Sequence, residues 1–585
     1  CQAIAYAIIG VNEWAVRLPS AIAALAVISL SFYTLHVYLA RQDELEHISR
    51  PTRRWLTAAL GAAIMALTPQ MIVWGRTGVS DMLLTGCIAT ALLCFFLGYA
   101  SKAMVSQRGL GGLPDERLAN PVRVASRSRS VFDRRREGGN GQWGRDTEVN
   151  SSQSLIANRQ SLLPNKWYLA FYVLIAGAIL TKGPVGIVLP GLIIAAFLLY
   201  VGSLREVLRE MRFFMGMLIV FGLSVPWYVL VIWRNGWNYI NSFFGYHNLE
   251  RFTEVVNGHR GPWYFYFLVV LLGFAPYSVY LPIAIARLKF WQVKYWRSQE
   301  RSQQLGLFAF VWFVGIFSFF TIAVTKLPSY VLPLMPAAAI LVTLLWSDFF
   351  LEKQTRGQGG QEKISSLSGL SSPTSSLLHF PTFPLWNGWV NVAFLSAVGV
   401  ALFHLPQLLG KDPAAPNFPQ QLQQLNLPML SGIIWLVSAG IIAVLLLRRL
   451  WLPIIGVNLL GLTAFLIVVL MPALFLVDHE RQLPLRELSA IAVQAKQPNE
   501  QLIMVGFKKP TVVFYSHENV TFFKFTEQAQ QHIQNQAANK AQPGSMLVLS
   551  QPKKLIQMGL QPADYENLGI SGAYQLIRVP LKSSG

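Results

Sequence analysis

The sequence predicts a polytopic α-helical membrane protein that ends in a small α/β domain. Three apolar stretches, residues 55–101, 167–202 and 306–347, are each too long for one crossing, because a helix rises about 1.5 Å per residue and the hydrocarbon core is about 30 Å thick. Their few charges lie near the middle, so each stretch is expected to form two spans joined by a charged turn at a membrane surface. Overall, 53% of the residues are apolar and only 13% are charged.

Hydrophobic patterning predicts twelve spans in the membrane domain, residues 1–477. They are expected at roughly residues 15–40, 56–74, 82–100, 167–181, 185–202, 213–233, 263–285, 306–324, 329–347, 387–408, 429–447 and 450–477.

The connections between these spans alternate in charge. Arginine- and lysine-rich connections follow every second span, at residues 41–54, 108–166, 205–212, 287–301 and 448–449. By the positive-inside rule these connections lie in the cytoplasm, which accounts for much of the net charge of +20 without a nucleic-acid partner. The intervening turns, at residues 75–81, 181–184, 234–262, 325–328 and 411–428, therefore share the outer face.

Two segments of the cytoplasmic side are expected to be disordered inserts. Residues 107–160 are rich in Arg, Ser, Gly and Asn, and residues 355–376 are rich in Gly and Ser, so neither can bury enough apolar surface to offset its ordering entropy.

Residues 478–585 are predicted to form a soluble extracytoplasmic α/β domain. Strands are expected at residues 501–507, 511–515, 520–525, 546–549 and 575–580, and helices at 485–495, 526–538 and 553–560. The domain has no nucleotide-binding glycine pattern, which favours a packing or acceptor-gating role over catalysis.

The rarest charges of the apolar segments make a candidate site on the outer face. Asp81 follows Arg76 in a short turn, and Lys182 and Lys326 lie in two similar turns, Thr181-Lys182-Gly183-Pro184 and Thr325-Lys326-Leu327-Pro328. A structural explanation exists for each, because an acid suits a helix N-terminus and a single lysine can extend into the headgroups. Two lysine turns on one face beside a carboxylate favour a phosphate-binding cluster.

The outer segment 234–262 carries further candidates. An amphipathic helix lying on the membrane explains its aromatic residues. It does not explain the clustering of His247, Arg251, His259 and Arg260, since histidine suits a cation or an acceptor and arginine suits a phosphate. No cofactor is implied with certainty. A divalent metal at His247 is left open, although no His-Glu-x-x-His spacing or acidic cage supports it.

The order of these motifs resembles the bacterial aminoarabinose transferase and protein O-mannosyltransferase family of integral-membrane glycosyltransferases. The resemblance runs from Gly10 to about Pro336, and a later piece, Lys509-Pro510 to Tyr515, resembles the external C-terminal domain of that family. It is carried by Gly10-Val11-Asn12-Glu13, Arg17-Leu18-Pro19-Ser20, Gly75-Arg76-Thr77 to Asp81, Thr181-Lys182-Gly183-Pro184, Tyr246-His247-Asn248-Leu249, His259-Arg260-Gly261-Pro262-Trp263 and Lys326-Leu327-Pro328-Ser329-Tyr330-Val331-Leu332-Pro333.

The resemblance implies a C-type glycosyltransferase fold in the bacterial inner membrane. The implied enzyme moves a hexose or pentose from a polyprenyl-phosphate carrier to a lipid or protein acceptor on the outer leaflet. It aligns Asp81 with an active-site acid and His247 with a metal or substrate ligand. It also implies a first span and an outer loop with the principal catalytic acid, which would precede Cys1.

With the reaction that this resemblance implies, we expect direct displacement with inversion at the anomeric carbon. We expect Asp81 to be catalytic, and Arg76, Lys182, Arg251, Arg260, Lys326 and Tyr330 to bind the substrate phosphate or sugar. The alternative is a polytopic transporter or lipid flippase, which would use the same spans and lysines for substrate passage.

Overall fold

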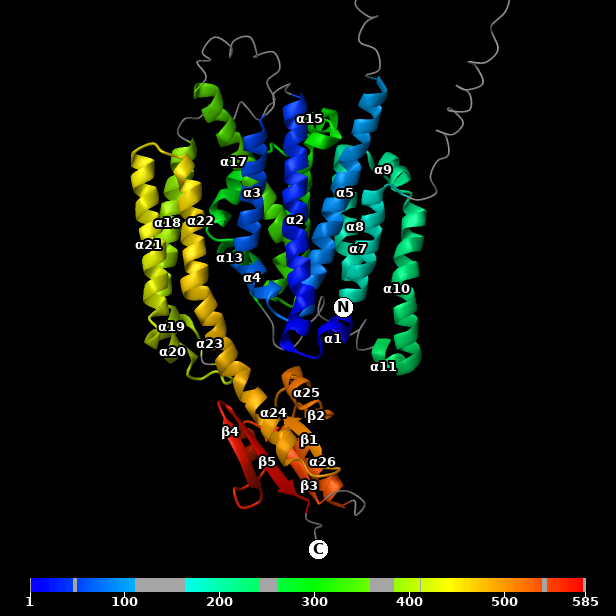
Figure 1. Cartoon of the computed structure of the whole chain (residues 1–585), viewed down its shortest axis with the longest axis vertical. Helices are drawn as coiled ribbons and strands as arrows, with labels where there is room; N and C mark the ends of the chain where they lie inside the picture. Colours follow the sequence, from blue (N-terminus) through cyan, green and yellow to red (C-terminus); the bar gives the residue numbers. More distant parts are fainter. Residues whose placement is uncertain are drawn as a thin grey trace, which may run out of the picture. The chain divides into compact units, whose positions relative to one another are not determined.

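The computed structural model describes residues 2–45, 50–110, 164–240, 261–357, 383–410, 412–538 and 544–581. The two predicted inserts lie almost wholly outside these ranges. By internal contacts the chain divides into two compact units, Cys1–Pro381 and Thr382–Gly585 (Figure 1). The second unit holds both membrane-type helices and the α/β domain, and the boundary proposed at residue 477 stays a prediction.

The described residues of the first unit form helices joined by turns. Its helices are α1 (Gln2–Ile9), α2 (Glu13–Leu45), α3 (Pro51–Leu67), α4 (Pro69–Gly75), α5 (Ser80–Leu110), α7 (Lys166–Lys182), α8 (Val185–Val201), α9 (Leu204–Glu210), α10 (Phe213–Asn235), α11 (Trp237–Ile240), α13 (Phe265–Gly273), η2 (Tyr277–Tyr280), α14 (Leu281–Ala286), α15 (Val293–Ser298), η3 (Arg301–Gln303), α16 (Leu305–Ile322), η4 (Pro328–Leu334) and α17 (Met335–Gly357).

Every predicted span has a helical counterpart, although two of them are broken. Within the described ranges, eight helices are long and apolar enough to cross a membrane, and two bent pairs bring the number to ten. The bend is 60° between α3 and α4 and 111° between α13 and the pair η2–α14. Pro69 starts α4 and Pro276 precedes η2, so each break lies where proline disfavours a continuous helix. The remaining predicted spans, α7 and α8, are 17-residue helices.

Burial separates central helices from peripheral ones in the first unit. The apolar window of Ser80–Ser101 is 89% buried and that of Pro328–Asp348 is 94% buried, whereas that of Phe213–Asn235 is only 17% buried. Around the central helices, Phe95 of α5, Phe197 of α8 and Phe308 of α16 form an aromatic cluster with ring centroids 5.1–5.7 Å apart. The exposed apolar surface of α10 fits contact with lipid.

Paired charges gather at one end of the first unit. Asp43 at the end of α2 forms ion pairs with Arg53 and Arg54 of α3, and Arg53 also donates to the Ser347 hydroxyl of α17. At the same ends of neighbouring helices, Arg287 pairs with Asp348 at 2.7 Å and Arg301 pairs with Glu210 at 2.9 Å. The alternating charge of the connections therefore corresponds to two chemically different ends of the bundle.

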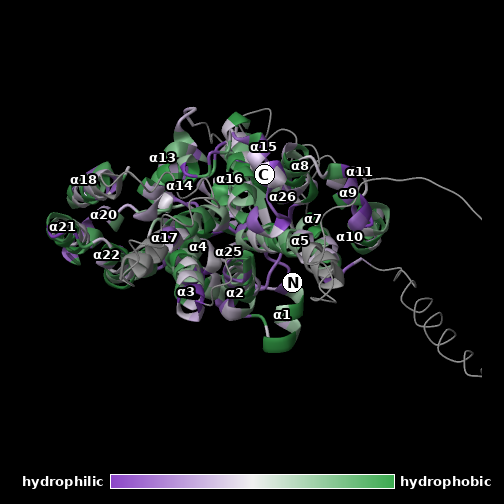
Figure 2. Ribbon diagram, turned by 90° about the horizontal axis from the view of Figure 1, so that it is seen from above, coloured by the Kyte–Doolittle hydropathy of each residue, from purple (hydrophilic) through white to green (hydrophobic). Residues whose placement is uncertain are grey.

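The second unit begins with apolar helices and ends in the α/β domain. Its elements are α18 (Phe383–Phe403), α19 (Leu405–Leu408), α20 (Phe418–Gln424), α21 (Leu427–Leu447), α22 (Leu452–Phe465), the π-helix η5 (Leu466–Leu470), α23 (Met471–Arg481), α24 (Leu483–Ala495), β1 (Gln501–Val505), α25 (Pro510–Ser516), β2 (Val520–Phe523), α26 (Thr526–Ala538), β3 (Ser545–Ser550), α27 (Pro552–Gln557), β4 (Glu566–Ser571) and β5 (Tyr574–Pro580). Figure 2 shows α18, α21 and α22 largely in the colour of apolar residues.

The sheet of this unit is mixed. Its strand order is β2-β1-β3-β5-β4, with β1, β2 and β3 parallel and β5 antiparallel to both of its neighbours. One apolar layer packs Leu502, Met504 and Leu549 against α24, and the other face of the sheet buries Ile503 and Val548.

The strand predicted at residues 511–515 is wrong, because this segment is helix α25. Pro510 stands at its first turn, where a fixed φ favours a helix, and of the β-branched run only Val512 is buried. The sequence analysis also missed β4, an edge strand with an irregularity between Asn567 and Gly569 and no fully buried residue.

Candidate functional site

An ion pair joins the candidate acid to the first candidate lysine. The Lys182 ammonium donates to the Asp81 carboxylate at 2.6 Å, and the side chains are 26% and 17% exposed respectively. Asp81 lies in the first turn of α5 and Lys182 is the last residue of α7, so each charge complements the dipole of its own helix. Gly183, with a φ of 74°, then turns the chain into α8. Local sequence thus sets both side chains at the meeting point of two helices.

The turn before Asp81 is held by α1 and α2. Gln2 donates to the carbonyl of Gly78 at 3.0 Å, and the Ser20 hydroxyl donates to the carbonyl of Val79 at 3.2 Å. A Cβ added at Gly78 would lie 2.2 Å from Cγ1 of Val16, so no side chain fits there. Arg76 caps the end of α4 and is exposed. These contacts fix where α5 begins and hence where Asp81 lies.

Lys326 has a different environment from Lys182. It is 7% exposed, and its ammonium donates to the carbonyls of Phe320 at 3.2 Å and Thr321 at 2.5 Å. These carbonyls belong to the last turn of α16, where backbone acceptors lack helical partners. The ring of Tyr266 lies 5.2 Å from the ammonium, and burial lowers the pKa of Lys326. The described contacts therefore give Lys326 a structural role at the end of α16.

Tyr330 connects these two lysines. Its ring centroid lies 6.0 Å from the Lys182 ammonium, within the range of a weak cation–π contact, and 5.0 Å from the ring of Phe320. Since Phe320 also accepts from Lys326, the structure brings Asp81, Lys182, Tyr330 and Lys326 into one region at the end of the bundle opposite the paired charges.

Three predicted site residues, His247, Arg251 and Arg260, lie outside the described residues. The chain is described again from Gly261, where an added Cβ would lie 3.0 Å from Cγ of Lys326. The outer segment therefore returns to the candidate region at its C-terminal end. Within the described ranges no group of three His, Cys, Asp or Glu side chains could hold a metal. The metal at His247 stays a prediction.

Tyr266 is a site residue that sequence reasoning missed. Its hydroxyl accepts a hydrogen bond from the backbone amide of Leu327 at 3.2 Å, while its ring faces the Lys326 ammonium. The residue stands in an aromatic run after Trp263 that reads as an ordinary lipid-facing segment, so no local signal separates it from its neighbours. It stabilises the turn of Lys326.

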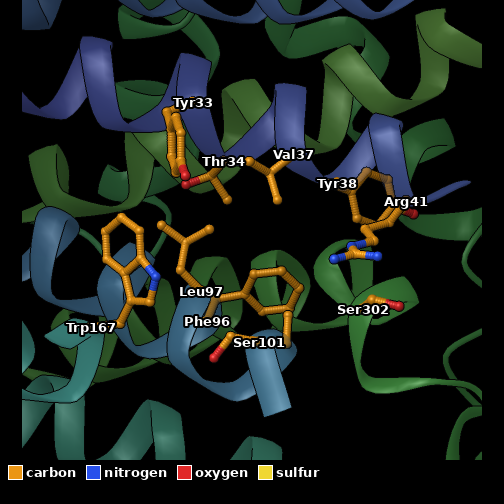
Figure 3. Close-up of a pocket in the computed structure, with 11 residues that line it drawn as sticks. Tyr33, Thr34, Val37, Tyr38, Arg41, Phe96, Leu97, Ser101, Trp167 and Ser302 are labelled. Carbon is orange, nitrogen blue, oxygen red and sulfur yellow. The ribbon is translucent and has the colours of Figure 1, made fainter. Parts of the chain in front are cut away.

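A pocket elsewhere in the first unit contains none of the predicted site residues (Figure 3). Tyr33, Tyr38 and Arg41 of α2 line one side of it, and Phe96 of α5 and Trp167 of α7 line the other. Phe96 is 15 residues beyond Asp81 on the same helix, which is about 22 Å along the axis. The pocket is therefore separate from the candidate region.

Comparison with known proteins identifies one family model and several similar proteins. Residues 495–584 match the family model described as the C-terminal domain of cyanobacterial RgtA-type glycosyltransferases. An uncharacterized protein of Aquifex aeolicus is 32% identical over 182 residues, which are 31% of this chain and 37% of that protein.

Two further relatives are named undecaprenyl phosphate-alpha-4-amino-4-deoxy-L-arabinose arabinosyl transferases. The one from Proteus mirabilis is 30% identical over 28% of each chain, and the one from Pseudomonas fluorescens is 25% identical over 55% of this chain and 52% of the relative. The chain thus spans between 28% and 52% of the length of these curated relatives.

The fold is similar to that of ArnT. A crystal structure of ArnT from Cupriavidus metallidurans bound to undecaprenyl phosphate matches with a TM-score of 0.63 at 18% identity, covering 99% of this chain and 86% of that one. The apo form of the same protein matches with a TM-score of 0.61. The predicted C-type glycosyltransferase fold with a small C-terminal sheet domain is confirmed. The resemblance carried by the ordered motifs is also confirmed, because the chain is similar in sequence and in fold to aminoarabinose transferases.

Proposed function

We propose, from this similarity in sequence and fold, that the chain is part of a membrane glycosyltransferase that takes a sugar from a polyprenyl-phosphate carrier. The observation that carries the proposal is the ion pair of Asp81 and Lys182 beside Tyr330. It puts a carboxylate and a cation, both partly exposed, at one end of an otherwise apolar bundle. Related transferases have names that specify an undecaprenyl-phosphate-linked sugar, and one ArnT structure holds undecaprenyl phosphate. A transporter is not favoured by these relatives.

The proposed reaction is a direct displacement with inversion. A hydroxyl oxygen of the acceptor forms a bond to the anomeric carbon as the bond from that carbon to the phosphate oxygen breaks. The acceptor proton passes to a carboxylate, for which Asp81 is our candidate, and the phosphate leaves with the electron pair. We propose that Lys182, Arg76 and Tyr330, together with Arg251 and Arg260, bind the leaving phosphate or the sugar, where this charge develops.

The other proposed assignments follow from the same comparison. The acceptor is a lipid or a protein, and the sugar is a pentose or a hexose. The protein resides in the bacterial inner membrane with its site and its α/β domain outside the cytoplasm, as the charge of the connections indicates. A divalent metal held with the help of His247 would add a further positive charge beside the leaving phosphate.

Transfer assays test the proposal. The full-length protein in proteoliposomes is supplied with polyprenyl-phosphate-linked aminoarabinose, a hexose or a pentose, and glycosylated lipid and protein are measured by mass spectrometry. Removing a positioned acid–base group or an electrostatic donor is expected to lower turnover by roughly 10²-fold or more, so Asp81→Asn and Lys182→Gln should both be nearly inactive. Lys294→Gln, an exposed lysine of α15, is the matched control. Near-normal turnover in both site variants would overturn the proposal.

A further inference from the structure

Five lysines lie at one edge of the sheet in the second unit. Strands β1, β2 and β3 are parallel, so their carboxyl ends meet at the same edge. Lysines follow each strand shortly after it ends. We call this set the lysine edge: Lys508 and Lys509 after β1, Lys524 after β2, and Lys553 and Lys554 after β3.

The lysine edge is the end of the α/β domain that lies next to the membrane helix of the same unit. Helix α24 continues from α23, and the Thr511 hydroxyl at the start of α25 donates to Gln482, the residue between these two helices, at 2.9 Å. Lys509 also lies within electrostatic range of Asp412, which pairs with Arg481 at the end of α23. Figure 1 shows α25 alongside the beginning of α24.

The opposite edge of the sheet is far from the membrane helix. At that edge Arg578 donates to the carbonyl of Ala495, the last residue of α24, and Lys496 pairs with Glu518 just before β2 at 2.6 Å. Helix α24 has 13 residues, so the two ends are about 20 Å apart. Because β1 runs back along α24, its carboxyl end returns to the side of α23.

Exposed apolar side chains lie among these lysines. Phe525 is 51% exposed and lies 5.2 Å from the Lys524 ammonium, and Ile556, which follows Lys553 and Lys554 on α27, is 69% exposed. The stem of Lys554 covers Gly506, where an added Cβ would be 3.3 Å from its Cγ. Of the described residues, two carboxylates lie in electrostatic range of these five lysines: Glu527 near Lys554, and Asp412, which is already paired with Arg481, near Lys509. The edge therefore has an excess of positive charge beside apolar groups.

We propose that the lysine edge docks on the surface of the bilayer that α22 and α23 enter, where its lysines contact the phosphates of anionic phospholipids. Lysine suits this contact as a compact charge with a flexible stem, and Phe525 and Ile556 suit the boundary between headgroups and acyl chains. Anionic lipids attract such basic segments over about one Debye length, close to 10 Å at ordinary salt. The docking fixes the orientation of the domain relative to its own membrane helix.

Backbone hydrogen exchange of the full chain in nanodiscs tests this proposal. One set of nanodiscs contains phosphatidylcholine alone and the other also contains phosphatidylglycerol. We expect the non-proline amides of residues 506–511 and 551–555 to exchange several-fold more slowly with phosphatidylglycerol, and high salt to remove the difference. Replacing the five edge lysines by Gln should abolish it, while Lys496→Gln at the far edge should retain it. Unchanged exchange in strands β1 and β3 of the five-fold variant would verify that its domain is folded.

Three results would overturn the proposal. The first is equal exchange in both kinds of nanodisc. The second is a lipid-dependent difference that persists in the variant without edge lysines. The third is that soluble glycerol phosphate, added to phosphatidylcholine nanodiscs, slows exchange of the same amides as much as phosphatidylglycerol does. That result would indicate a site for a free anion at the point where the strand order reverses between β1 and β3. None of these results depends on glycosyl transfer, so the proposed function is tested separately.

Discussion

Lys182 and Lys326 occupy similar turns in the sequence, but their surroundings give them different roles. Lys182 lies in a partly exposed ion pair, which contributes about 1 kcal/mol or less to stability. Lys326 is buried and satisfies two carbonyls at the end of α16, and leaving such groups without partners costs about 1–3 kcal/mol. The sequence placed both lysines in similar turns but could not predict their partners, because Asp81 belongs to another helix and the carbonyls of Phe320 and Thr321 are acceptors only where α16 ends.

This contrast predicts that Lys326→Met destabilises the protein more than Lys182→Met does. Thermal unfolding of the purified protein in detergent, followed by circular dichroism, should show a clearly lower midpoint for the first variant and a small change for the second. Lys326→Arg keeps a cation near the same carbonyls and should recover part of the loss. An unchanged midpoint in Lys326→Met would contradict a structural role for its ammonium.

Helix packing in the first unit depends on glycines where two helices approach closely. A Cβ at Gly86 of α5 would lie 2.6 Å from Cβ and 3.1 Å from Cα of Ala23 in α2, whereas a Cβ at Gly191 of α8 would meet nothing within 4 Å. Overpacking a tight contact costs about 1–3 kcal/mol, and alanine in an open helical position is favoured over glycine.

Gly86→Ala is therefore expected to lower the unfolding midpoint, and Gly191→Ala to leave it unchanged or raise it. Both substitutions add one methyl group to a helical glycine, so the second variant is a matched control for the first. Chemical denaturation in detergent micelles measures the difference. The interpretation fails if the two variants lose stability equally.

Helices and strands were predicted correctly where the hydrophobic pattern is strong, and were missed or misassigned where it is weak. Each long apolar run predicted as a span is helical in the structure, because such runs have few alternatives to a membrane helix. The bends at Thr68 and Pro276 depend on packing around proline and were read as continuous spans. In the α/β domain, the apolar run at residues 511–515 becomes helix α25 under the influence of Pro510. The exposed edge strand β4 carries too little apolar alternation to be recognised.

For the whole molecule, the alternating charge of the connections predicts which side of the membrane each end faces. The structure separates a paired-charge end, with Arg53, Arg287 and Arg301, from the end with Asp81 and Lys182. The charges of the connections predict from sequence alone that the two ends of the bundle differ. It could not give the grouping of Tyr266, Tyr330 and Lys326, which depends on how α13 and α16 pack.

Labelling of single cysteines from outside intact cells tests this orientation. Val79, beside Asp81, is 43% exposed, and Val79→Cys should react with a membrane-impermeant maleimide. Lys294→Cys on α15 should react only after the cells are permeabilised. Both variants are best made without the native cysteines, although Cys94 is buried. Reaction of both positions from the same side would refute the predicted orientation.

The ion pair of Asp81 and Lys182 also affects which anions can bind at the candidate site. Asp81 and Lys182 together carry no net charge, so an arriving anion must compete with a carboxylate for the lysine. Under the proposed function, a phosphodiester carries one delocalised negative charge and is stabilised only weakly by displacing Asp81 from Lys182. A phosphate whose charge grows as the sugar departs gains more, and the Asp81 oxygens are released at the same moment. Ordinary phospholipids of the surrounding leaflet would then be poor inhibitors, because their phosphate never acquires the second charge.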